Sequence, residues 1–189
     1  MVTLLVSLAL GASDLSCAVM GSPAPMNAPD ALDYAGVRYP FCCGGCDATF
    51  GKEPGKYVLK AAKEGKAIGY FLFEPTTGAK LDPKKMPALY ADYKGTRYFF
   101  ASADNKKAFD GDHARFDKPV TKEVMYCSVM GHAIDGVGAA GSYADFEGVR
   151  YYFCCMDCNA AFKKDPMKYA ESVKGKIQES KATKPAKGS

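Results

Sequence analysis

Residues 149–162 read VRYYFCCMDCNAAF, and residues 37–50 read VRYPFCCGGCDATF. In both stretches an aromatic run leads into a Cys-Cys-x-x-Cys cluster, and the stretch closes on a phenylalanine. Residues 96–109 read TRYFFASADNKKAF, which keeps the arginine and the aromatic positions but contains no cysteine. Self-similarity at this spacing predicts three copies of one supersecondary unit.

The similarity extends, without gaps, over residues 34–57, 93–116 and 146–169. Each copy places a glycine between a short alternating segment and the aromatic run, which indicates a β-hairpin with a tight turn. Beyond the cluster, residues 157–164 have a helical pattern, and Asp165 followed by Pro166 is typical of the start of a second helix. The sequence therefore predicts an α+β fold in which each copy is a short hairpin followed by one or two helices.

The cysteines fall into two sets with the same internal order, a lone thiol and then, about two dozen residues later, the cluster. The first set is Cys17, Cys42, Cys43 and Cys46, and the second is Cys127, Cys154, Cys155 and Cys158. Zinc and copper(I) prefer soft sulfur ligands that converge from separate parts of a chain. At a junction between a strand and a helix, cysteines three or four positions apart can converge on one point. We therefore expect two thiolate metal sites, with three or four ligands each.

Two methionines and one histidine are further candidates. Met20 and Met130 lie three residues after Cys17 and Cys127, close enough to serve as thioether ligands if the ion is copper(I). Methionine at such a place also commonly fills a core. His132 follows the turn of the second set and could lie near that site.

The middle copy serves as an internal control. Where the outer copies have cysteines, it has Glu74, Ala101, Ser102 and Asn105. It keeps the glycine, the arginine and every aromatic position. We infer that these shared residues make the fold and that the thiols serve a function. The alternative is that the middle copy folds without metal only because its neighbours pack against it.

The segment from Tyr151 through the cluster to Tyr169, together with the Cys-x-Val-Met-Gly element at Cys127, resembles a YHS domain of the TRASH type. The resemblance covers nearly everything between Cys17 and Tyr169. It implies metal binding by one early cysteine and a Cys-x-x-x-Cys pair, in heavy-metal handling, sensing or transport. The ligands so implied are Cys17, Cys42 and Cys46, and Cys127, Cys154 and Cys158. The extra cysteine of each cluster and the thiol-free middle copy depart from the family pattern.

The repeat and the composition together predict five segments. Residues 1–13 resemble a signal peptide, residues 14–66 form a first cysteine-containing unit, residues 67–118 a degenerate unit, residues 122–175 a second cysteine-containing unit, and residues 176–189 a disordered lysine-rich tail. The first ten residues are apolar but too few to span a bilayer, and Gly11 and Ser13 suit cleavage before Asp14. We expect a periplasmic or secreted protein, with a cytoplasmic one as the alternative.

The net charge of +4 arises within residues 174–189, which hold five lysines and one glutamate, so the rest of the chain carries no net charge. A nucleic-acid-binding protein would need a basic face on its folded part, and the sequence supplies no surplus for one. The sequence therefore indicates metal ions as the ligands, with a metal-transport or other protein as a partner, and neither nucleic acid nor a stable membrane span.

Three alternatives to a metal carrier stay open. Eight cysteines in an oxidising compartment usually pair, which favours a disulfide-stabilised scaffold. The Cys-x-x-Cys spacing within each cluster is shared with thiol-disulfide oxidoreductases, although the repeats are too short for the βαβ framework around such a motif. Structural zinc in a protein-interaction module is the third. The main expectation is a protein without enzymatic activity that stores or delivers zinc or copper.

Overall fold

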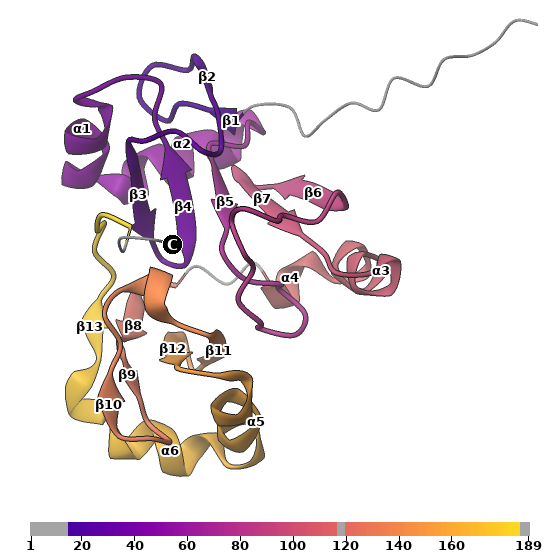
Figure 1. Ribbon diagram of the computed structural model, residues 1–189, viewed down its shortest axis with the longest axis vertical. Coiled ribbons are helices and arrows are strands. Elements are labelled where there is room, and N and C mark those ends of the chain that lie inside the picture. Colours follow the sequence, from indigo (N-terminus) through magenta and orange to yellow (C-terminus); the bar gives the residue numbers. More distant parts are fainter. Residues whose placement is uncertain (1–14, 117–119, 186–189) are drawn as a thin grey trace, which may run out of the picture.

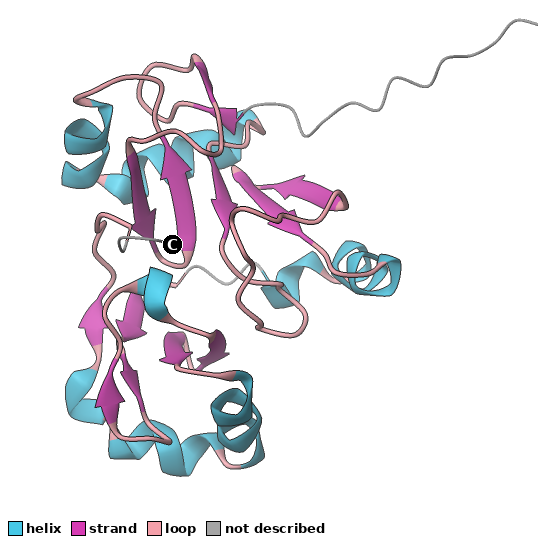
Figure 2. Cartoon of the chain, in the orientation of Figure 1, coloured by secondary structure: helices cyan, strands magenta, loops and turns pink. Residues whose placement is uncertain are grey.

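The computed structural model describes residues 15–116 and 120–185. The signal-peptide-like segment predicted at residues 1–13 lies outside the described residues. Every helix in the described part of the chain falls short of the length and apolar character that a membrane span requires. The chain has the α+β fold class that the sequence predicts. It forms two lobes that each contain strands and helices (Figures 1 and 2).

Within the described residues, the strands form two larger sheets and two small ones. The upper sheet has the order β3 (Ala31–Tyr34), β4 (Val37–Pro40), β5 (Gly69–Phe71), β7 (Thr96–Phe99) and β6 (Tyr90–Tyr93). The lower sheet has the order β11 (Ser142–Phe146), β12 (Val149–Phe153), β8 (Lys122–Val124) and β13 (Gln178–Glu179). The small ribbons pair β1 (Leu15–Ser16) with β2 (Pro23–Ala24), and β9 (Tyr126–Cys127) with β10 (His132–Ala133).

A pair of helices follows each of the three hairpins. These are α1 (Cys46–Lys52) with α2 (Pro54–Glu64), α3 (Ala103–Gly111) with α4 (His113–Phe116), and α5 (Met156–Lys164) with α6 (Pro166–Ser172). Short 3₁₀ turns lie at η1 (Val137–Ala139) and η2 (Lys174–Lys176). The predicted start of the last helix is confirmed, because Asp165 caps α6 by accepting a hydrogen bond from the backbone N–H of Lys168.

The three hairpins share one turn geometry. In each, two successive residues have positive φ, and the second is the predicted glycine: Ala35 and Gly36, Lys94 and Gly95, Glu147 and Gly148. Two left-handed residues are what a two-residue turn needs to match the twist of its strands. Packing also requires glycine at position 36, since a Cβ atom there would lie only 2.8 Å from Arg150 Nη1 and from the ring of Phe71.

An aspartate and an arginine face each other across every hairpin. Each pair is bidentate: Asp33 with Arg38, Asp92 with Arg97, and Asp145 with Arg150, at nitrogen–oxygen distances of 2.7–3.0 Å. The arginine side chains are buried. These ion pairs explain why the arginine recurs whether or not a copy has cysteines. The position serves the hairpin and not the thiols.

The aromatic positions form the core of each copy. Phe50, Phe109 and Phe162 are all at most 1% exposed, and each packs on the tyrosine that directly follows the hairpin arginine. The ring centroids lie 4.7 Å apart for Tyr39 and Phe50, 4.9 Å for Tyr98 and Phe109, and 4.9 Å for Tyr151 and Phe162. The prediction that these aromatics are core residues is confirmed.

The second and third hairpins have a further feature in common, because each pairs with a parallel neighbour strand of its own. In the upper sheet Tyr70 of β5 lies opposite Arg97, and in the lower sheet Glu123 of β8 lies opposite Arg150. The first hairpin, in contrast, joins the second through β5, which pairs with both β4 and β7. The predicted boundary between the first and second units, after residue 66, is therefore followed by β5, and this strand joins the hairpins of both units in one sheet. The three-unit division stays a prediction about the sequence repeat.

The expectation of a disordered tail from residue 176 is wrong for residues 178–184. β13 pairs with β8, and Thr183 exchanges two backbone hydrogen bonds with Asp33 of β3. Lys184 then forms an ion pair with Asp47, beside the first cysteine cluster. The lysine-rich composition predicted a solvated, unstructured segment. The edge strands of both sheets have unpaired backbone groups, however, and these bind the backbone of this segment. Residues 186–189 lie outside the described residues.

Lys80 makes a half-buried cationic contact between the lobes. Its Nζ donates to the backbone oxygen of Val137 at 3.0 Å and lies 4.8 Å from the ring centroid of Phe73. Burial lowers the pKa of Lys80 to about 8. Between pH 8 and the ordinary lysine pKa, the unfolded chain therefore binds more protons than the folded chain, and folding stability rises with pH.

Lys80→Met should remove this dependence. The wild type should gain up to roughly 3 kcal/mol of unfolding free energy relative to the variant as pH rises from about 8 to about 10.5. Urea denaturation of both proteins across this range measures the difference, in which cysteine and tyrosine titrations cancel. A difference that is independent of pH would contradict the lowered lysine pKa.

Candidate metal centres

The lone cysteine of each set begins a tight turn. Cys17 follows β1, and its backbone oxygen accepts from the N–H of Gly21 at 2.8 Å. Cys127 ends β9 and makes the same bond with Gly131, also at 2.8 Å. Both glycines have a φ of 73°, which only glycine adopts readily. The Cys-x-Val-Met-Gly element is therefore one turn that appears twice and directs a cysteine inward.

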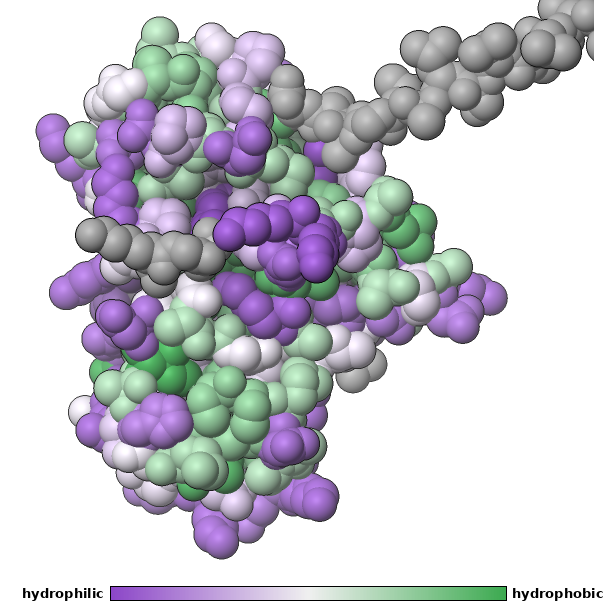
Figure 3. Space-filling model, viewed as in Figure 1, coloured by the Kyte–Doolittle hydropathy of each residue, from purple (hydrophilic) through white to green (hydrophobic). Residues whose placement is uncertain are grey.

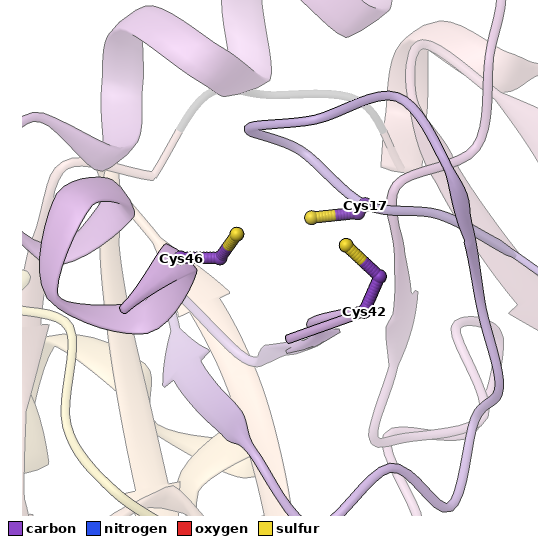
Figure 4. A group of neighbouring side chains, drawn as sticks. All are labelled: Cys17, Cys42 and Cys46. Carbon is purple, nitrogen blue, oxygen red and sulfur yellow. The ribbon is translucent and has the colours of Figure 1, made fainter. Parts of the chain in front are cut away.

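The cluster cysteines lie where a hairpin strand passes into a helix. Cys42 comes just after β4, and Cys46 is the first residue of α1. Together with Cys17, their Sγ atoms lie within 4.8 Å of one another, and Figure 4 shows the three side chains pointing to a common centre. The first site thus gathers sulfur from segments separated by about 25 residues of chain.

The second site repeats this arrangement in the lower lobe. The Sγ atoms of Cys127, Cys154 and Cys158 also lie within 4.8 Å of one another. Cys154 Sγ is 3.8 Å from Cys127 Sγ and 3.6 Å from Cys158 Sγ. A zinc–sulfur bond of about 2.3 Å corresponds to sulfur–sulfur separations of roughly 3.8 Å in a tetrahedral site and 4.0 Å in a trigonal one. The three thiols therefore fit a soft metal ion with little movement.

Burial differs systematically among the sulfurs. Cys17 and Cys127 are at most 1% exposed, and Cys46 and Cys158 are also buried. Cys42 and Cys154 are half-buried, whereas Cys43 is exposed. All eight cysteines are free thiols in the structure. Each site thus has a buried floor and an outer side that reaches solvent.

Burial and hydrogen bonds shift the cysteine pKa values within each cluster in opposite directions. Burial raises the pKa of Cys127, but backbone N–H groups of Cys154, Met130 and Val129 donate to its sulfur and make the net shift downward. Cys17 has a lowered pKa for the same reasons. Burial and neighbouring sulfurs raise the pKa of Cys158, and contact with Cys17 raises that of Cys42 to about 11. Any of these cysteines that is protonated must lose its proton when it binds an ion, so metal binding at these sites releases protons and depends on pH.

The fourth cysteine of each set lies beside its cluster and outside it. Cys155 Sγ is 3.4 Å from Cys158 Sγ and 4.0 Å from Cys154 Sγ. Cys43 Sγ is 3.4 Å from Cys46 Sγ and 3.6 Å from Cys42 Sγ. The structure thus brings together three of the four predicted sulfurs at each site. Ligation by Cys43 and Cys155 stays a prediction.

The other candidates lie at the surface. Met20 and Met130 are 64% and 63% exposed, so their side chains would have to turn inward to reach the sulfurs. His132 is exposed in β10, opposite Cys127, and does not belong to the cluster. On the face seen in Figure 3, apolar residues gather over the lower lobe, where β9, β10 and α5 lie.

The middle copy keeps the turn but uses a carboxylate. Glu74 occupies the place of the lone cysteine, and its backbone oxygen accepts from Gly78 at 2.8 Å. Its buried Oε2 accepts from the backbone N–H groups of Thr76 and Thr77 at 3.1 and 2.6 Å. A side-chain acceptor at this position therefore receives hydrogen bonds from backbone N–H groups in all three copies. The sequence signal was the alignment of Glu74 with the lone cysteines, which identified the position but not this role.

Comparisons with protein-family models, curated proteins and solved structures gave no match. The resemblance to a YHS domain of the TRASH type therefore stays a prediction based on the residues that carry it. The cysteine geometry stands independently of that resemblance, because it depends only on positions within this chain.

Proposed function

We propose that this protein binds one soft metal ion, zinc or copper(I), at each of two cysteine-thiolate sites and stores or delivers these ions. The observation that carries the proposal is the convergence of three sulfurs from separate segments at two equivalent places. Three thiolates are enough ligands for copper(I), whereas zinc would take these three and one further ligand. The proposed function includes no catalytic step. Export to the periplasm or beyond, suggested by residues 1–13, is part of the same proposal.

Structural zinc in a protein-interaction module is the second candidate. It is supported by the burial of Cys17 and Cys127, because an ion held there would tie the turn to the core. Against it stands the middle copy, which makes the same hairpin, ion pair and aromatic core with Glu74 in place of the cysteine. This copy reaches the same local structure without thiols, within a sheet that it shares with the first copy. Storage and delivery are therefore favoured.

Removal of the metal distinguishes the two candidates. After treatment with a chelator under reducing conditions, the protein should keep its far-ultraviolet circular dichroism spectrum and a cooperative thermal transition, at a lower Tm. Readdition of zinc or copper(I) should restore the original Tm, since binding to the folded state alone raises stability. Loss of the folded spectrum on chelation would favour structural zinc instead.

A further inference from the structure

Each cluster has an additional thiol on its outer side. Cys155 lies beside Cys154 and Cys158 of the second cluster, and Cys43 lies in the same way beside Cys42 and Cys46 of the first. Neither belongs to the group of three sulfurs that surround a common centre. A tetrahedral site would require all six sulfur–sulfur separations to be near 3.8 Å. The geometry therefore describes three inner sulfurs and one adjoining sulfur, in two places.

The adjoining thiol of the second site does not cap its helix as the equivalent serine of the middle copy does. In the middle copy the equivalent residue, Ser102, caps α3 by accepting a hydrogen bond from the backbone N–H of Asn105 at 3.2 Å. Cys155 is the N-cap of α5, but no side-chain cap bond is formed there. Cys43 lies before Gly44 and Gly45, where an added Cβ would meet nothing within 4 Å. Cys43 is exposed and Cys155 is partly exposed, and each thiol contacts two sulfurs of its cluster.

Access to the ion is one-sided. Cys127 and Cys158 form the buried floor of the second site, whereas Cys154 and Cys155 reach solvent. An acceptor that takes the ion directly must approach from that outer side, because it cannot reach the buried sulfurs. On that outer side, the sulfur of Cys155 lies next to the cluster and is accessible to an approaching acceptor.

We propose that Cys155, and Cys43 at the first site, is the exchange thiol through which the ion passes to an acceptor bearing thiolates; this rests on the proposed function. Cys155 loses its proton to solvent as its bond to the ion forms. The bond to Cys127 then breaks, and that sulfur takes up a proton. Thiolates of the acceptor bond the ion on the outer side and replace Cys154, Cys155 and Cys158, whose released sulfurs take up protons from solvent. The oxidation state of the ion does not change.

Transfer rates of single variants test this role. Zinc-loaded wild type, Cys155→Ser and Cys43→Ser are mixed anaerobically with a Cys-x-x-Cys peptide or with glutathione, and native mass spectrometry follows the loss of zinc with time. Serine should preserve the fold, as Ser102 does in the middle copy. Each variant should hold two ions at equilibrium. One of the two ions should leave roughly tenfold more slowly than from the wild type, or slower still. Effects of this size are typical of groups just outside a ligand shell.

The control is Met156→Leu, which changes the neighbouring exposed residue and should transfer both ions at the wild-type rate. The transfer rate to one of the two acceptors, the Cys-x-x-Cys peptide or glutathione, should depend more strongly on Cys155. That acceptor shows which kind of thiolate partner the site serves. Wild-type rates in both serine variants would overturn the exchange role while leaving the proposed function intact. Loss of one bound ion in Cys155→Ser would overturn it too, since Cys155 would then be a resident ligand. A wild-type protein that binds no zinc would overturn the proposed function itself.

Discussion

Cys127→Ser is expected to lower the number of bound ions from two to one, and Cys17→Ser to do the same at the other site. Each of these cysteines supplies the most buried sulfur of its cluster and the one whose pKa is lowered by backbone N–H groups. A serine hydroxyl is a hard ligand that stays protonated at neutral pH, so it cannot replace a thiolate toward zinc or copper(I). The double variant should bind no ion.

Native mass spectrometry after anaerobic loading counts the ions, and circular dichroism checks that each variant is folded. Met130→Leu is the matched control, because it lies in the same turn as Cys127 but is 63% exposed. It should still bind two ions. Two ions in a folded Cys127→Ser variant would show that the second cluster is not the binding site.

Arg38→Met is expected to destabilise the fold by about 3–5 kcal/mol, the usual result of removing one partner from a buried ion pair. Asp33 is only 1% exposed, and its backbone is bonded to Thr183, so water cannot easily solvate the remaining carboxylate. Methionine retains much of the packing volume. The loss therefore reports mainly the uncompensated charge.

Arg97→Met is the matched variant. It removes the same bidentate pair from the second hairpin, but Asp92 is 36% exposed and can be hydrated after the change. Urea denaturation should give a clearly smaller loss, on the order of 1–2 kcal/mol. Equal losses in the two variants would contradict the view that burial of the aspartate decides the cost.

The local features of the fold could be read from the sequence because short-range rules determine them. The glycine turns needed positive φ at Gly36, Gly95 and Gly148, and the periodic aromatics identified the cores around Phe50, Phe109 and Phe162. The convergence of Cys17 with Cys42 and Cys46 also followed from spacing, since a strand-to-helix junction and one distant turn suffice to form a site.

Long-range pairing could not be read in the same way. Nothing in residues 69–71 indicates that β5 joins two hairpins into one sheet, because strand pairing depends on tertiary context. The tail was misjudged for a related reason: Lys181 and Lys184 are exposed to solvent, while the backbone around them pairs with the edges of both sheets. The separation of Cys155 from its cluster likewise depends on where α5 begins, at Met156, a detail finer than sequence patterns resolve.

Native mass spectrometry of the wild-type protein, purified anaerobically and then incubated with zinc or copper(I), bears most directly on the idea of two sulfur-lined pockets. Two ions per chain, bound while every thiol stays reduced, is the predicted spectrum. A chain without ions, or one lighter by two hydrogens for each disulfide formed, would contradict it.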